Sequence, residues 1–199
     1  MKKKIIFATT NEGKMKEIRL ILQDLNYDII SMKEAGIDVD IIEDGSTFEE
    51  NAVIKAKTIM EMTGEIVLAD DSGLEVDAMD KAPGVYSARF LGEDTSYDIK
   101  NNYILDQLKG LPEEKRSARF VCAIACAFPD GEVVTTRGTI EGSIGHEIIG
   151  DNGFGYDPIF WVPEMACSSA QLSMEIKNKI SHRGKALEAM KGIIQNKLK

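Results

Sequence analysis

Two adjacent carboxylates, Asp70 and Asp71, follow the apolar run Ile66–Ala69 and precede Ser72 and Gly73. The apolar run predicts a buried strand that ends where the carboxylates begin. One carboxylate at a strand end has many structural explanations, but two in succession suggest chemistry. Proteins bind Mg²⁺ through one or two carboxylates together with substrate phosphates and water, so this pair is a candidate metal site.

A second polar group, Thr9–Lys14, reads T-T-N-E-G-K and lies between a predicted strand at Lys4–Ala8 and a helical pattern at Lys14–Leu25. Free backbone N–H groups at a helix N-terminus bind anions, and a lysine there adds positive charge. Phosphate is the expected ligand of this segment, although the spacing G-x-x-x-x-G-K-[ST] of the P-loop is absent. Since Thr and Asn are also common capping residues, an ordinary helix cap explains the motif equally well.

A second helical pattern places Asn51 and Lys55 on one face, because residues one turn apart are neighbours, and Glu43 lies shortly before this helix. Each residue alone fits a solvated face or an acidic loop. The combination is more informative, because the carboxyl ends of adjacent parallel strands meet in one crevice. There Thr9–Lys14 would hold phosphates and Asp70-Asp71 would hold the metal ion.

Two further blocks have residues suited to a nucleotide base. Gly150–Phe160 is rich in glycine and contains Phe154 and Tyr156, which could stack on a flat ring. A loop with several turns, with its aromatic residues in the core, is the alternative. Lys177–Gly184 contains two cations and His182, which fit a polar wall for a base or phosphate, whereas a lone histidine is usually only a helix-start residue.

Alternating strand and helix signals must position these groups. The predicted elements are a strand at Tyr27–Ser31, a helix from the capping pair Thr47 and Glu50 to Gly64, a helix at Thr95–Leu108 capped by Thr95 or Ser96, a hairpin of Ala118–Phe128 and Glu132–Glu141 around Pro129-Asp130-Gly131, and a helix at Ser181–Lys197 with Ser181 as its cap. The order predicts an α/β protein with a mixed sheet.

The composition excludes several classes of protein. The 199 residues include 33 Asp plus Glu against 24 Lys plus Arg, with a pI of about 4.9, so we expect no nucleic-acid partner. The N-terminus is too weakly apolar for a signal peptide or membrane anchor, which predicts a cytoplasmic protein with no membrane partner. The three cysteines lack C-x-x-C spacing, and Cys122 and Cys126 are expected to be small core residues on one face of a strand.

Six blocks in this order resemble the inosine/xanthosine triphosphate pyrophosphatase family across almost the whole chain: T-T-N-E-G-K, E-D-G-S-T-F-E-E-N-A-V-I-K-A, A-D-D-S-G-L-E-V-D, A-P-G-V-Y-S-A-R-F, G-F-G-Y-D-P-I-F and I-S-H-R-G. The resemblance implies a single nucleoside-triphosphate pyrophosphatase domain over residues 1–199. It would have an elongated mixed sheet flanked by helices, with two lobes around a substrate cleft. It also implies a homodimer that uses Mg²⁺ to hydrolyse the purine nucleoside triphosphates ITP, dITP and XTP to the monophosphate and pyrophosphate.

The resemblance also implies a role for each matching residue. Asp71 would be the catalytic base and a metal ligand, and Glu43 would be the second metal carboxylate. The triphosphate would be bound by a loop of Thr9, Thr10, Asn11, Glu12, Gly13 and Lys14, with Lys55 as an additional phosphate contact, and Ser72 would also contact substrate. The residues that bind the base would be Phe154, Gly155, Tyr156, Asp157, Lys177, His182 and Arg183. Asp70 would hold Asp71, a metal ion or a lysine in place.

Two departures from the family pattern concern loops. Asp80-Lys81 replaces two glycines before A-P-G, and Ala166-Cys167-Ser168 replaces G-K-T. Two rival functions also remain at this point. A nucleotide-binding regulator would not need Glu43 and Asp71 together, and a phosphoesterase acting on polynucleotides would need an extended basic path that this acidic chain does not offer.

Overall fold

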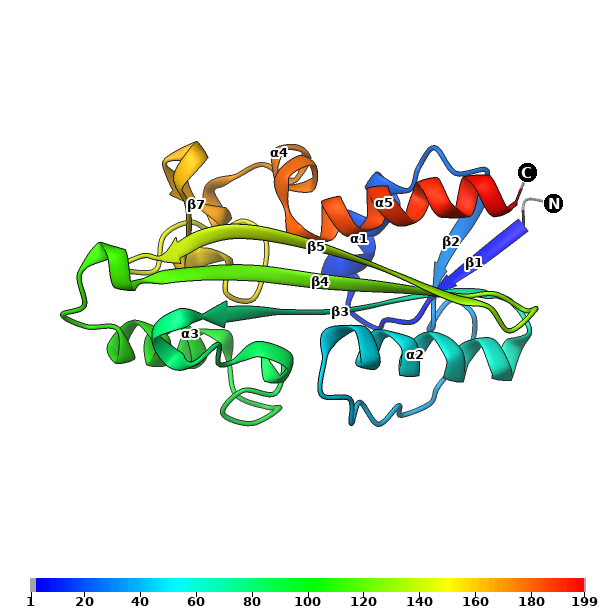
Figure 1. Cartoon of the computed structure of the whole chain (residues 1–199), viewed down its shortest axis with the longest axis horizontal. Helices are drawn as coiled ribbons and strands as arrows, with labels where there is room; N and C mark the ends of the chain where they lie inside the picture. Colours follow the sequence, from blue (N-terminus) through cyan, green and yellow to red (C-terminus); the bar gives the residue numbers. More distant parts are fainter. Residues whose placement is uncertain (1–2, 199) are drawn as a thin grey trace. The chain divides into compact units, whose positions relative to one another are not determined.

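The computed structural model describes residues 3–198, which contain a seven-stranded sheet in the order β2-β1-β3-β4-β5-β6-β7. The strands are β1 Lys3–Phe7, β2 Tyr27–Ser31, β3 Ile66–Val76, β4 Ser117–Ala127, β5 Val133–Ile144, β6 Phe160–Val162 and β7 Cys167–Ser168. The α-helices are α1 Glu12–Ile21, α2 Phe48–Thr63, α3 Tyr97–Gln107, α4 Met174–Ile180 and α5 His182–Lys197 (Figure 1). Strand β1 is parallel to β2 and β3, whereas β6 is antiparallel to β5 and β7, so the predicted α/β class with a mixed sheet is confirmed.

The chain forms two compact units. The first contains residues 3–71, 122–138 and 182–198, and the second contains residues 72–121 and 139–181. Strands β3, β4 and β5 therefore each contribute residues to both units.

In the first unit, α1 and α5 pack on one face of the strands. Their core includes Ile18 of α1, Met190 of α5, Leu68 of β3 and Cys122 and Cys126 of β4, all buried. Figure 1 shows α2 on the other side of these strands from α5. The side chains of a strand point alternately to its two faces, so every second residue of β3 points toward α1 and α5 and the others point toward α2.

The second unit has a separate core, in which α3 packs against strands and a short turn. Leu74 of β3, Ile104 of α3, Phe120 of β4, Ile144 of β5 and Tyr156 all belong to it. The two cores are built from different segments of the same long strands.

Most predicted elements and caps are confirmed. The bounds of β2 are as predicted, Thr47 caps α2, Gly64 ends α2 in the left-handed conformation with φ +66°, and Ser96 caps α3. The hairpin is also confirmed, because β4 and β5 are neighbours and the Phe128 N–H donates to the Glu132 carbonyl across the predicted turn.

Two predictions about the elements are wrong, and one helix was not predicted. Strand β3 does not end before the two carboxylates but continues through them to Val76. Helix α1 begins at Glu12, capped by Asn11, and ends at Ile21, earlier at both ends than the predicted helix. Lys177 lies within a short helix, α4, that was not among the predicted elements.

The predicted burial of Cys122 and Cys126 on one face of β4 is confirmed, and burial raises the pKa of both thiols to about 12. No helix of residues 3–198 has the length and apolar character needed to cross a membrane.

Asp80 and Lys81, which replace two glycines of the family pattern, both adopt left-handed backbone conformations, with φ +51° and +65°. This conformation brings the Cβ atom of an L-residue close to the following carbonyl oxygen. The backbone therefore keeps the shape that glycine would adopt more easily.

We expect the substitution Lys81→Gly to raise the free energy of unfolding by about 1 kcal/mol, because glycine adopts φ +65° without a Cβ clash. Denaturant unfolding measures the change. The matched control is Lys57→Gly, at an exposed position inside α2, which should lower stability by about 1 kcal/mol. A loss of stability in Lys81→Gly would show that the left-handed conformation of Lys81 does not destabilise the folded protein.

Candidate functional site

The carboxylate of Asp70 points toward α1 and α5 and is bound there by two cations. Lys14 Nζ lies 2.9 Å from Asp70 Oδ2, and Arg183 Nη2 lies 3.4 Å from the same oxygen. The second nitrogen of the guanidinium, Nη1, donates to Glu17 Oε2 at 2.6 Å. Asp70 is only 1% exposed and Arg183 2%. Burial favours the neutral acid, but the positive charges of Lys14, Arg183 and Lys55 outweigh it and hold the pKa of Asp70 well below its usual range.

The carboxylate of Asp71 points to the opposite face, toward α2. Asn51 Nδ2 donates to Asp71 Oδ2 at 3.0 Å, and Asn51 Oδ1 accepts from the Gly45 N–H at 2.8 Å. A Cβ atom at Gly45 would lie 2.7 Å from Asn51 Oδ1, so the loop can approach the amide this closely only with glycine. Burial raises the pKa of Asp71, partly opposed by the charge of Lys55 and by the hydrogen bond from Asn51.

Lys55 connects Asp71 with Glu43. Its Nζ donates to Glu43 Oε2 at 2.8 Å. Burial lowers the pKa of Lys55, but the charges of Asp70, Asp71 and Glu43 outweigh burial and raise it. A cation therefore already lies among the carboxylates of the first unit.

The donor set near Lys55 suits a hard cation, since Glu43 and Asp71 supply carboxylate oxygens and interact electrostatically with each other. Residues 3–198 contain no cluster of three or more His, Cys, Asp and Glu side chains arranged to hold a metal ion. Two protein carboxylates, with further ligands from phosphate and water, are a donor set that hard cations use in phosphate-binding sites.

The loop Thr9–Lys14 forms the N-terminal cap of α1. Asn11 Oδ1 accepts from the Lys14 N–H at 3.1 Å, and Thr9 Oγ1 accepts from the Asn11 N–H at 3.1 Å. Thr10, Asn11 and Glu12 are exposed. The ordinary capping role is thus present, and binding of phosphate by this loop stays a prediction.

In the second unit, the turn Gly153–Asp157 is fixed by the buried carboxylate of Asp157. This carboxylate accepts from the Phe154 N–H at 2.9 Å, from Ser169 Oγ at 2.9 Å and from Lys177 Nζ at 2.6 Å. Lys177 Nζ also lies 4.9 Å from the centroid of the Phe154 ring, within cation–π distance. Asp157 and Lys177 therefore form an ion pair beside the ring of Phe154.

The predicted site residues are divided between the two units. Thr9–Lys14, Glu43, Lys55, Asp71, His182 and Arg183 belong to the first unit, and Ser72, Phe154–Asp157 and Lys177 belong to the second. The first unit brings Lys14, Glu43, Lys55 and Asp71 into linked charge networks. The guanidinium of Arg183 is bound by Asp70 and Glu17, and its predicted contact with a base stays a prediction.

Two residues of these networks, Asn51 and Glu17, were not among the site residues predicted from the sequence. Asn51 was noted only because it shares a helix face with Lys55, and its hydrogen bond to Asp71 depends on the position of β3. Glu17, the partner of Arg183, gave no signal, because nothing in a helical pattern reveals a partner 166 residues away.

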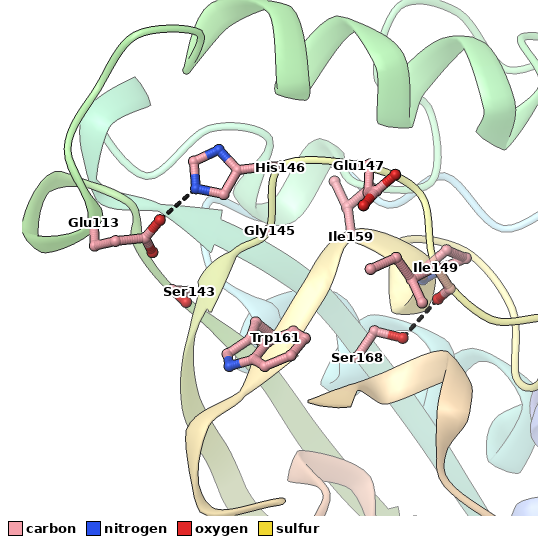
Figure 2. Close-up of a pocket in the computed structure, with 10 residues that line it drawn as sticks. Glu113, Ser143, Gly145, His146, Glu147, Ile149, Ile159, Trp161 and Ser168 are labelled. Atoms are coloured by element: carbon pink, nitrogen blue, oxygen red, sulfur yellow. Dashed lines mark hydrogen bonds and ion pairs between the residues drawn. The ribbon is translucent and has the colours of Figure 1, made fainter. Parts of the chain in front are cut away.

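A cavity of about 350 Å³ lies elsewhere in the second unit, and none of the predicted site residues lines it. Figure 2 shows Trp161 on its wall and a hydrogen bond between His146 and Glu113 at its edge. The other lining residues are Ser143, Gly145, Glu147, Ile149, Pro158, Ile159 and Ser168.

The mixed sheet, the capped loop at α1 and the convergence of carboxylates and lysines define an α/β protein with a candidate site for a phosphate ligand and a divalent cation. Residues 5–193 match the Ham1 family, and the chain belongs to this family. The family predicted from the sequence motifs is therefore confirmed.

Named relatives and solved structures agree with this assignment. A dITP/XTP pyrophosphatase of Desulforamulus reducens is 50% identical over 185 residues, which cover 93% of this chain and 92% of the relative. One of Bacillus subtilis is 44% identical over 193 residues, 97% of this chain and 98% of the relative. The solved Ham1 protein of Staphylococcus aureus has a TM-score of 0.87 at 41% identity and covers 98% of this chain and 100% of its own.

We expect Asp70→Asn to lower the free energy of unfolding by about 3 kcal/mol, because it leaves the buried guanidinium of Arg183 and the ammonium of Lys14 without this carboxylate. Urea unfolding of wild type and variant measures the loss. The control is Asp24→Asn, which removes an exposed pair with Lys191 and should change stability by less than about 1 kcal/mol. Equal effects of the two substitutions would contradict the structural role of Asp70.

A comparison of wild type with Asp70→Asn also tests whether the pKa of Asp70 is lowered in the folded protein. The pKa of Asp70 is lower when folded than the unfolded value near 3.8, so its stabilisation is present above that pH and is lost as the pH falls toward the folded pKa. Asp70→Asn should therefore lose stability less steeply than wild type below about pH 4. A steeper loss would contradict the lowered pKa.

Proposed function

We propose that this protein is a nucleoside-triphosphate pyrophosphatase that hydrolyses deaminated purine nucleoside triphosphates, ITP, dITP and XTP, to the monophosphate and pyrophosphate. The observation that carries the proposal is the network of Asp71, Asn51, Lys55 and Glu43, which offers carboxylates and a cation in the pattern that triphosphate hydrolysis requires. Relatives named dITP/XTP pyrophosphatase that match over more than nine-tenths of their length support the choice of substrate.

In this proposal Asp71 is the base. It orients a water molecule for in-line attack on the α-phosphorus and accepts its proton, while the bond from that phosphorus to the bridging oxygen breaks and pyrophosphate leaves. Burial raises the pKa of Asp71, and the positive charge of Lys55 partly opposes this effect. Asn51 restrains the carboxylate by its hydrogen bond to Oδ2.

We propose that Glu43 and Asp71 hold Mg²⁺, which supplies charge neutralisation on the phosphates when it is bound. Lys14 and Lys55, together with the backbone N–H groups of Thr9–Lys14, would bind the triphosphate. Both lysines are held in place before substrate arrives, Lys14 by Asp70 and Lys55 by Glu43. Pre-positioned cations need less reorganisation when the phosphates bind.

The base would be bound by Phe154, Gly155, Tyr156, Asp157, Lys177, His182 and Arg183, and Ser72 would also contact substrate. Hypoxanthine and xanthine carry an oxygen at C6, where adenine carries an amino group, so a donor such as Lys177 would be satisfied by these bases and not by adenine. A buried polar group left without a partner costs about 1–3 kcal/mol, which is enough to select between them. Guanine has the same C6 oxygen, so its rejection would have to depend on contacts around C2. We further propose that the enzyme is cytoplasmic, acts as a homodimer on free nucleotides, and has no nucleic-acid or membrane partner.

The substrate proposal is tested with a panel of purine and pyrimidine nucleoside triphosphates in the presence of Mg²⁺, with pyrophosphate and orthophosphate assayed separately. We expect pyrophosphate release, fastest with ITP, dITP and XTP, and loss of activity when Mg²⁺ is chelated. Orthophosphate alone would indicate a phosphoesterase, and binding without turnover would indicate a regulator. Sedimentation velocity of the same sample tests the dimer, which a monomer would contradict.

Asp71→Asn should reduce kcat by at least about 10²-fold while the affinity for ITP changes little, because the amide cannot accept the proton of the attacking water. Steady-state kinetics and equilibrium binding of ITP measure the two effects. The matched control is Asp44→Asn, in the exposed loop beside Glu43, which should leave turnover unchanged. Turnover at the wild-type rate in Asp71→Asn would exclude Asp71 as the base.

A further inference from the structure

Helix α3 of the second unit contains two consecutive asparagines in different environments. Asn102 is exposed, and its Nδ2 donates to the Asp98 carbonyl in the same helix at 2.8 Å. Asn101 is only 2% exposed, and its Nδ2 donates to the backbone carbonyl of Gly155 at 3.1 Å, 54 residues later in the chain. The buried asparagine therefore joins α3 to the turn Gly153–Asp157.

The orientation of the Asn101 amide follows from chemistry, because a backbone carbonyl accepts hydrogen bonds and only the amide nitrogen can donate one. The other side of the amide, Oδ1, is buried and has no hydrogen-bond partner among residues 3–198. A buried acceptor without a partner costs free energy that an apolar side chain of similar size would avoid. Asn101 is therefore a poor choice for core packing, and the donor it offers to Gly155 is its distinguishing feature.

The turn itself needs such support. Gly153 and Gly155 have φ +76° and +69°, in the left-handed region. Besides accepting from Asn101, the turn contacts α3 through Tyr97, whose ring packs edge-on against Tyr156 with the centroids 5.2 Å apart. Tyr156 in turn donates its hydroxyl to the Ser87 carbonyl at 2.7 Å.

The two ends of the turn are thus fixed by different helices. Asp157, paired with Lys177 of α4, binds the Phe154 N–H. Asn101 of α3 binds the carbonyl of Gly155, the residue that directly follows Phe154. The peptide before Phe154 and the peptide after Gly155 are therefore held, which limits the backbone conformations of Phe154 and Gly155 and the directions that the Phe154 ring can take.

We propose that Asn101 is a positioning residue for the base, which fixes the peptide between Gly155 and Tyr156 so that the ring of Phe154 and its neighbours bind the purine. The inference rests on the proposed function, in which Phe154 contacts the base. Asn101 does not act on the reacting phosphorus, so it contributes equally to binding of the substrate and of the transition state. Such uniform binding affects KM rather than kcat.

The test compares Asn101→Asp with Asn102→Asp, the same change at the neighbouring exposed position. In Asn101→Asp, a carboxylate oxygen faces the Gly155 carbonyl in place of the donor. We expect its KM for ITP to rise about tenfold with kcat within about twofold of wild type, the effect of losing one buried hydrogen bond. Asn102→Asp should match wild type in both constants.

Product inhibition separates a role at the base from a general structural role. The inhibition constant of IMP, which carries the base, should rise about tenfold in Asn101→Asp, whereas that of inorganic pyrophosphate, which lacks it, should not change. Equal effects on both inhibitors, or a fall in kcat at constant KM, would overturn the inference. Thermal unfolding checks that the variant is folded, and if it is not, Asn101→Ser is measured in the same way with Asn102→Ser as its control.

The outcomes distinguish the two proposals. A wild-type protein that releases no pyrophosphate from any nucleoside triphosphate refutes the proposed function. A wild-type protein that is active on ITP, with Asn101 variants that match their Asn102 controls in KM and in inhibition by IMP, refutes the positioning role of Asn101 and leaves the proposed function intact.

Discussion

Consecutive residues of a β-strand point to opposite faces of the sheet. Asp70 and Asp71 are consecutive residues of β3, so their side chains meet different charged and polar groups of the first unit. Strand β3 continues beyond the last residue that pairs with β1, where Phe7 is opposite Leu68. Asp70 and Asp71 therefore lie in the part of β3 beyond its pairing with β1, because the chain after β1 has entered the loop before α1. Asp70 binds cations from α1 and α5, and Asp71 binds an amide from α2.

This separation has electrostatic consequences. Two residues of one type, adjacent in sequence, have pKa values shifted in opposite directions, because Asp70 is surrounded by positive charges that outweigh its burial and Asp71 is not. Asp70 is thereby fixed as an ionised partner for Lys14 and Arg183. The pKa of Asp71 is raised by burial. The two carboxylates therefore have different surroundings, and only Asp71 has a role in the proposed hydrolysis.

The second unit uses buried polar groups in a similar way. Asp157, which is paired with Lys177 of α4, and Asn101 of α3 each satisfy a backbone group of one short turn. Two glycines of this turn have positive φ, and hydrogen bonds from buried side chains fix its shape together with the packing of Tyr156 in the core. In both units, therefore, buried polar residues such as Asp70 and Asn101 hold in place the groups that are expected to contact substrate.

Local sequence patterns were sufficient to predict several caps, the hairpin turn and the family. Caps at Thr47, Ser96 and Gly64 and the hairpin turn follow from backbone hydrogen bonding and positive φ, which act over a few residues, and six ordered motifs were sufficient to identify the family. The extent of β3 depends on packing, since Asp70, Asp71 and Ser72 are polar and pairing within the sheet keeps them in a strand. The tertiary structure also decided which face each carboxylate occupies and which partners it meets. Arg183 is 113 residues from Asp70, and no local periodicity encodes a contact at that separation, because it forms only when the sheet and its helices have packed.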